Sequence, residues 1–190
     1  MSRTRVRDLP GAAEQEVVLL GWLYNRRSSK KMHFLQLRDG SGIVQCIVTR
    51  DDVGEDDFAQ IGQIPYESSI ELKGTAHADD RAPGGVEVHT SAVTVISAAE
   101  DYPIAKQDHG PDFLLRHRHL WLRSRKQVAL MHIRDEVIRA IRDSMHELGF
   151  ICIDAPIFTP NSCEGTSTLF EVDYFDDEKA FLTQSGQLYM

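Results

Sequence analysis

The pattern of hydrophobic and polar positions changes character near residue 100. Up to that point, apolar residues occur in short blocks or alternate with polar ones, which is typical of buried and half-buried strands. Beyond residue 124, apolar residues recur at steps of three and four, which is typical of an amphipathic helix. The first part therefore predicts five strands, at residues 17–23, 33–38, 43–48, 68–76 and 86–96.

The spacing of the five strands predicts how they connect. Asp39-Gly40-Ser41-Gly42 reads as a tight turn, so residues 33–48 are expected to form a hairpin. Residues 55–63 are polar and predict a short helix after the third strand. Five short strands with a helix after the third fit a five-stranded OB barrel, although the pattern alone leaves other small barrels open.

The second part predicts one long helix followed by strands. The helix is expected to begin after Ser124, a suitable N-cap, and to end before Gly149, a suitable C-terminal stop. Strands are expected at residues 150–158, 169–175 and 179–184, so the second part begins an α+β domain with an antiparallel sheet. The apolar stripe of the helix consists of Leu130, Ile133, Val137, Ile141, Met145 and Leu148.

A polar stretch with two prolines and a glycine, residues 99–112, lies between the two patterns and reads as a linker. We therefore expect two domains: an OB-fold domain over residues 1–101, a linker or hinge over 102–124, and the first part of an α+β domain over 125–190. The 190 residues allow for either one large domain or two small ones.

Charge is distributed unevenly along the chain. The formal net charge is -8, which by itself argues against a nucleic-acid partner. However, residues 1–50 carry nine Lys and Arg against four Asp and Glu, whereas residues 51–102 carry two against twelve. A basic first segment can attract phosphates locally, although the same residues could simply form a solvated hairpin tip.

Other classes are disfavoured by composition. No stretch approaches the roughly 20 apolar residues of a membrane span, and the arginine-rich start lacks the apolar core of a secretory signal. The three cysteines are far apart, without CxxC spacing, which argues against a disulfide framework or a zinc site. We expect no metal site in this chain, and a cytoplasmic location.

Three segments together carry a family resemblance: HGPDFLLRHRHLWLRS (109–124), PIFTPNSCEGTSTLF (156–170) and FLTQSGQLYM (181–190). In this order, after a barrel and a linker, they resemble the class II aminoacyl-tRNA synthetases. The subgroup with an N-terminal OB domain charges aspartate, asparagine and lysine tRNAs. The resemblance extends from about residue 17 to residue 190.

The resemblance implies that the barrel reads an anticodon. In that family, an arginine, a phenylalanine and a glutamine receive the central uridine, and here they match Arg27, Phe34 and Gln45. Single-stranded bases stack on aromatic rings, an amide can donate to and accept from a base edge, and an arginine can hold a phosphate. Arg26 is expected to add phosphate attraction, together with Lys30 and Lys31. Without the resemblance, Phe34 would be read as a core residue.

The resemblance also assigns residues of the second part. Glu164, Ser185 and Gln187 match positions that surround the bound amino acid in the family, where Glu164 can accept from the ammonium group. Without the family context, Glu164 would be read as a surface carboxylate. The helix and the strand ending at Pro156 match the first signature motif, which implies a homodimer. Locally, Pro156 is also explained as a strand terminator.

The amino-acid substrate is indicated by two departures from the aspartyl pattern. Aspartyl enzymes carry a proline where this chain has Gly186, and a substrate-pairing lysine where it has Met190. A desolvated substrate carboxylate without a counter-charge is costly, whereas an asparagine amide needs none. QSGQLY and HLWLRS are also typical of asparaginyl enzymes, so we expect asparagine, ATP and the asparagine tRNA as substrates, with Mg²⁺ as cofactor.

In the family, the arginines of the second and third motifs follow QSGQLY. We therefore expect this chain to be the first part of a longer enzyme, to hold no catalytic residue of its own, and to be unable to form the adenylate by itself. ATP and Mg²⁺ are expected to bind mainly outside it. Pyrophosphate exchange by the chain alone would contradict this expectation. The alternatives are a truncated, non-catalytic RNA-binding module, an aspartyl enzyme, or a generic single-strand-binding OB protein.

Overall fold

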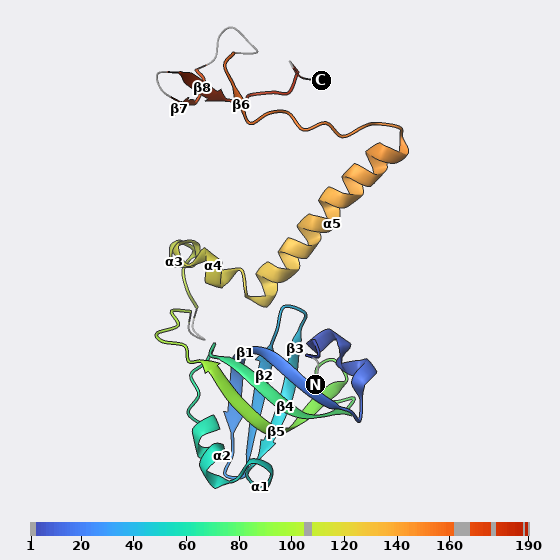
Figure 1. Ribbon diagram of the computed structural model, residues 1–190, viewed down its shortest axis with the longest axis vertical. Coiled ribbons are helices and arrows are strands. Elements are labelled where there is room, and N and C mark those ends of the chain that lie inside the picture. Colours follow the sequence, from blue (N-terminus) through green and yellow to red (C-terminus); the bar gives the residue numbers. More distant parts are fainter. Residues whose placement is uncertain (1–2, 105–107, 162–167, 176–177, 188, 190) are drawn as a thin grey trace. The chain divides into compact units, whose positions relative to one another are not determined.

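The computed structural model describes residues 3–104, 108–161, 168–175, 178–187 and 189. The chain divides into two compact units, residues 1–110 and 111–190, each of which is described by itself. The first unit contains the barrel, and the second contains the long helix and a small sheet (Figure 1).

The first unit is a closed barrel whose strands follow the order β1-β2-β3-β5-β4. Neighbouring strands are antiparallel except for β3 and β5, which pair in parallel. The five predicted strands and the OB barrel are therefore confirmed. The strands are β1 (Glu16–Ser28), β2 (Met32–Arg38), β3 (Ile43–Thr49), β4 (Ser69–Ala78) and β5 (Val86–Ser97).

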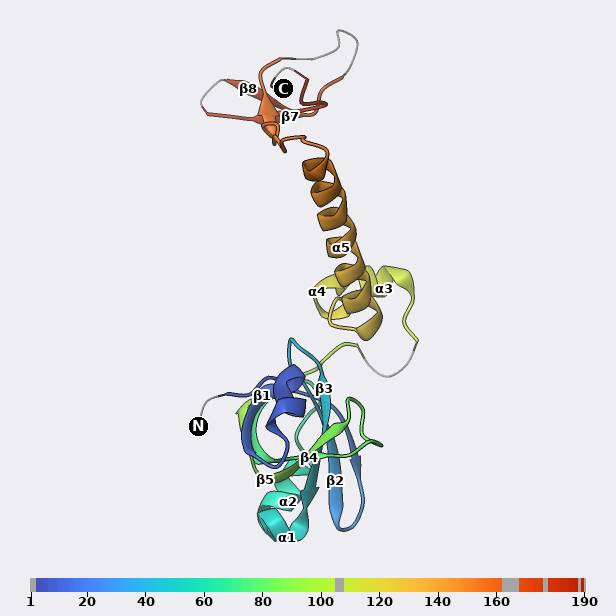
Figure 2. The same ribbon diagram turned by 90° about the vertical axis from the view of Figure 1, so that its right-hand side faces the viewer.

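Short helices lie at the two ends of the barrel. Figures 1 and 2 show α1 (Arg50–Val53) and α2 (Glu55–Ile61) at one end and the 3-10 helix η1 (Val6–Ala12) towards the other. Alternate strand residues point inwards and form one apolar core, which Leu9 of η1 and Phe58 of α2 join. The helix predicted at residues 55–63 is confirmed as α2.

Two local features fix the strand connections. The carboxylate of Asp39 accepts hydrogen bonds from the backbone N–H groups of Ser41 (2.7 Å) and Gly42 (3.0 Å), which closes the predicted turn between β2 and β3. At Gly74, where β4 and β5 slip in register, an added Cβ would overlap the carbonyl oxygen of His89. The absence of a side chain therefore allows β5 to approach β4 closely at this point.

The second unit begins with α3 (Pro111–Arg116) and α4 (Arg118–Trp121), which lie within the stretch predicted as a linker. The long predicted helix is confirmed as α5 (Arg125–Glu147), with Ser124 at its N-cap and Gly149, at a φ of 89°, just after its end. β6 (Phe158–Thr159), β8 (Lys179–Leu182) and β7 (Glu171–Asp173) form an antiparallel sheet in that order.

The strand predicted at residues 150–158 is wrong over most of its length. Residues 150–157 have no regular structure, and only Phe158 and Thr159 pair with β8. Pro156 has no N–H to donate to a ladder, and Ile151 and Ile153 are exposed, with no strand paired to them among the residues that the structure describes. An apolar run became a strand only where a partner was present. In the part of the chain that is described, no helix is long and apolar enough to cross a membrane.

Candidate nucleic-acid interface

A bulge in β1 decides which basic residue lies on the outer face of the barrel. The register with β2 pairs Leu23 with Leu37 and then Asn25 with Gln36, so Tyr24 is the extra residue. Beyond the bulge, Arg27 lies opposite Phe34, and the half-buried Phe34 alternates with buried neighbours on β2. Directly opposed residues of a sheet share a face. The guanidinium carbon of Arg27 lies 5.8 Å from the centre of the Phe34 ring, within cation–π range.

Gln45 lies on the same outer face, one strand further along. It is opposite Gln36 of β2 on one side and Glu87 of β5 on the other. Its side-chain amide donates to a carboxylate oxygen of Glu87 at 3.4 Å. Arg27, Phe34 and Gln45 thus lie on three adjacent strands of one face. Three side chains could contact the same base only if they shared a face in this way.

Arg26 is placed differently. It lies opposite the buried Leu35, and its guanidinium donates to the backbone carbonyls of Ile61 (3.1 Å) and Ile64 (2.8 Å) at the end of α2. Its charge also lies 5.5 Å from the ring of Tyr66. The structure therefore gives Arg26 a role in holding α2 against the barrel, and its predicted phosphate contact stays a prediction.

The predicted amino-acid-binding residues lie in the second unit. Glu164 lies outside the described residues. Ser185 is half-buried, and its hydroxyl accepts from the backbone N–H of the exposed Gln187 at 3.4 Å, so these two residues belong to one turn. The carbonyl of Pro156 accepts from the Thr183 hydroxyl at 2.8 Å, which ties the proline to the segment just before this turn.

Three residues beside Gln45 were not selected from the sequence. Glu87 is only 9% exposed, and it joins Gln45 to His89, whose ring packs against His77 of β4. The alternation along β5 indicates that Glu87 and His89 share a face. Their nearness to Gln45, however, depends on the parallel pairing of β3 with β5, which no local pattern specifies.

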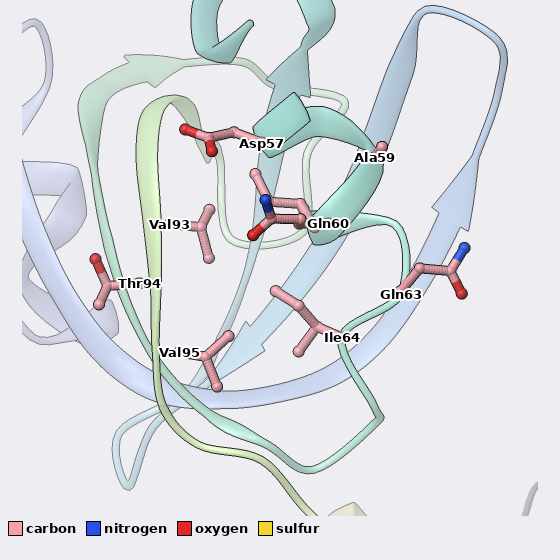
Figure 3. A pocket seen from close by; sticks show the side chains of 9 residues that line it. Asp57, Ala59, Gln60, Gln63, Ile64, Val93, Thr94 and Val95 are labelled. Carbon is pink, nitrogen blue, oxygen red and sulfur yellow. The ribbon is translucent and has the colours of Figure 1, made fainter. Parts of the chain in front are cut away.

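An open pocket of about 690 Å³ lies elsewhere on the barrel, between α2 and β5. Figure 3 shows Val93 and Val95 of β5 facing Gln60 and Ile64 across it. It shares no lining residue with the predicted RNA contacts, so it is a separate feature.

The barrel and the side chains on its outer face indicate a class of protein. A closed five-stranded barrel of this strand order is an OB fold, and an aromatic ring, an amide and a guanidinium are groups with which OB folds bind nucleic acid. A family profile with that description matches residues 17–96. A second, described as class II tRNA synthetases (D, K and N), matches residues 110–190. The two matches together run from residue 17 to residue 190, with residues 97–109 between them.

Individual relatives agree over the whole chain. The asparagine–tRNA ligase of Sorangium cellulosum is 52% identical over 96% of this chain and 41% of its own length. That of Thermus thermophilus is 48% identical over 98% and 43%. The structure of asparaginyl-tRNA synthetase from Pyrococcus horikoshii, complexed with asparaginyl-adenylate, matches with a TM-score of 0.89 and 36% identity over 100% of this chain and 44% of that one. The chain thus spans less than half the length of these relatives.

Proposed function

We propose that this chain acts in asparagine–tRNA ligation, where the barrel reads the anticodon and the second unit supplies part of the amino-acid site. The observation that carries the proposal is the identity of about half with asparagine–tRNA ligases along the whole chain. The Arg27, Phe34 and Gln45 face supports the same assignment because it is suited to one unstacked base.

Each of the three side chains has a distinct part in anticodon reading. Phe34 offers a half-exposed ring on which the central base stacks. Gln45 offers an amide that can both donate to and accept from the base edge, and Glu87 holds one end of that amide. Arg27, over the Phe34 ring, supplies positive charge to the neighbouring backbone phosphate.

Asparagine is proposed as the amino acid, bound in part by Glu164, Ser185 and Gln187. Glu164 would accept from its ammonium group, and Gln187 would donate to its carboxylate. The turn in which Gln187 donates to the Ser185 hydroxyl supports the placement of these two residues at one site. Met190 and Gly186 favour asparagine over aspartate because neither supplies a cation for a side-chain carboxylate.

The proposed reaction has two steps. The asparagine carboxylate attacks the α-phosphate of ATP, which releases pyrophosphate, and a ribose hydroxyl at the 3′ end of the tRNA then attacks the acyl carbon, which releases AMP. ATP and Mg²⁺ are proposed from the family alone. In the described part of the chain, no group of three or more His, Cys, Asp or Glu side chains could hold a metal ion, so no step is derived through the metal. The proposed location is the cytoplasm.

A homodimer is proposed through α5 and the segment that ends at Pro156. The apolar stripe of α5 is exposed along its whole length in the second unit, from Leu130 to Leu148. A stripe of this size calls for a covering surface, and a second copy of the protein fits the family's first motif.

The proposal is tested by binding of this chain to an asparagine-tRNA anticodon stem-loop at fixed salt, with a central uridine-to-cytidine variant beside it. We expect tighter binding of the uridine loop, and we expect Phe34→Ala and Gln45→Ala to remove that preference. Thr94 is an exposed residue of β5 that lies seven positions beyond Glu87, beside the separate pocket, so Thr94→Ala should leave the preference intact. Equal and strongly salt-dependent binding of both loops would leave only phosphate attraction and favour a non-catalytic RNA-binding module.

A further inference from the structure

Two histidines form a paired cluster on the outer face of the barrel. The ring centres of His77 (β4) and His89 (β5) lie 4.4 Å apart. Each ring is held by a carboxylate, since His77 Nδ1 lies 3.1 Å from Glu14 and His89 Nε2 lies 3.0 Å from Glu87. The second oxygen of Glu87 accepts from Gln45 at 3.4 Å. The histidine pair is therefore connected to the amide that is proposed to read the central base.

His89 also lies in line with Phe34 across the sheet. Phe34 of β2 is opposite Ile47 of β3, and Ile47 is opposite His89 of β5. Two strand spacings separate Phe34 from His89, roughly 9–10 Å. RNA-binding sheets of another fold stack two or three successive bases on aromatic side chains of adjacent strands. Ile47, which lies between the two rings, provides an apolar surface there.

The chemistry around His89 favours a base over a phosphate. Glu14 and Glu87 place two carboxylates against the histidine pair, which disfavours a phosphate at this point. The side chain of His89 is 51% exposed, so much of the ring is available for contact. His77 on one side and the bond from Nε2 to Glu87 limit the orientations that the ring can take.

We propose that His89 is a second stacking platform, which receives the anticodon base next to the one on Phe34, and that His77 and Glu87 position its ring. The proposal rests on the proposed anticodon reading and adds a second base contact to it. Sequence specificity is not required of this contact, because every base offers a π-face.

The test separates the ring of His89 from its hydrogen bond. His89→Phe keeps an aromatic ring but cannot bond Glu87, whereas His89→Gln can bond Glu87 but has no ring. In stem-loop binding at fixed salt, we expect His89→Phe to stay within about twofold of the unaltered chain, because its ring can still pack against His77. His89→Gln and His89→Ala should each weaken binding about fivefold or more. Thr94→Ala serves as the control, and the melting temperature of each variant shows whether it is folded.

Two further measurements identify the ligand group. Two stem-loops are made, each with one abasic nucleotide, on the 5′ side or on the 3′ side of the central uridine. One of them lacks the base that stacks on His89, so His89→Ala should not weaken the binding of that loop. The slope of binding against salt should be the same for His89→Ala and the unaltered chain, because no phosphate contact is lost.

The proposal is overturned if His89→Gln retains affinity while His89→Phe loses it, if the salt slope falls in His89→Ala, or if neither abasic loop removes the effect. It is equally overturned if all His89 variants bind as the unaltered chain does. These results are independent of the preference for uridine over cytidine, which the unaltered chain alone reports, so failure of this contact and failure of the proposed function are distinguishable.

Discussion

His33 shows how one buried side chain ties β2 to α2. Its Nε2 lies 3.0 Å from the carbonyl oxygen of Phe58, its Nδ1 lies 2.8 Å from the hydroxyl of Ser28, and its ring stacks on that of Phe58 at 3.9 Å. A carbonyl can only accept, so Nε2 carries the proton and donates. Burial lowers the pKa of His33, and the positive charge of Arg26 lowers it further, against a raising effect of the Phe58 carbonyl.

This lowered pKa predicts a pH dependence of stability. The unfolded imidazole takes up a proton near its ordinary pKa of about 6.5, whereas the folded one stays neutral to lower pH. The unfolded state thus binds more protons, and the free energy of unfolding falls as the pH drops below about 6.5. The free energy of unfolding can be measured with urea at mildly alkaline and at mildly acidic pH. The difference between the two values should be smaller for His33→Gln than for the unaltered chain. An unchanged difference in His33→Gln, or an equal reduction in the exposed His132→Gln, would refute the assignment.

At this scale, the sequence identified residue types better than orientations. The pair Arg26-Arg27 was expected to face RNA as a whole, yet one of them bonds carbonyls near α2 and the other lies over Phe34. The bulge at Tyr24 inverts the alternation of β1 at that point. Nothing in the residues from Leu23 to Arg27 specifies a bulge, so their faces could not be assigned from the pattern.

Among the elements, the joint between β2 and the start of β4 depends on a buried ion pair. Arg38 donates to Glu67 at 2.6 Å, and the two side chains are only 11% and 7% exposed. The backbone N–H of Glu67 also donates to the carbonyl of Leu23 at 2.7 Å, so the pair joins β1 and β2 to the segment just before β4. The guanidinium carbon of Arg38 lies 5.1 Å from the centre of the Tyr24 ring.

Removing one partner of this pair should be strongly destabilising. Glu67→Ala leaves the charge of Arg38 buried without its counter-ion, which costs about 3–5 kcal/mol. Glu71→Ala removes a more exposed pair with Lys73 (3.4 Å) and should cost less than about 1 kcal/mol. The free energy of unfolding from urea titration compares the two variants. Similar small losses would mean that solvent reaches the Arg38 charge in the folded barrel.

Elements were predictable where the sequence pattern and the partner strand agreed. Strands β1 to β4 alternate over most of their length because one side of each is buried, and α5 has a continuous apolar stripe between a suitable cap and a glycine stop. The strand predicted at residues 150–158 did not form over residues 150–157. An apolar run indicates that a segment is buried, but it does not indicate whether a neighbouring strand is there to pair with it. The parallel pairing of β3 with β5, which brings Glu87 and His89 beside Gln45, is likewise a long-range property.

At the scale of the whole molecule, the second unit is marked by apolar surface that it does not bury. Ile133, Val137 and Ile141 are each more than half exposed, and all lie on one side of α5. Soluble proteins rarely leave a continuous apolar stripe in water, so a covering surface is expected. The relatives extend well beyond the aligned part, and the proposed dimer assigns the covering surface to a second copy of the protein.

The dimer is tested by a charge placed in the centre of the stripe. In Ile141→Asp, an unpaired carboxylate would be buried between two copies, at a cost of about 3 kcal/mol or more, so the dissociation constant should rise at least about 100-fold. His132→Asp puts the same charge on the opposite side of α5 and should leave the dimer intact. Sedimentation velocity over a range of concentrations measures the association, and circular dichroism shows whether α5 persists in each variant. A chain that is monomeric throughout, or a dimer that Ile141→Asp leaves unchanged, would assign the stripe to contacts within a single copy of the protein.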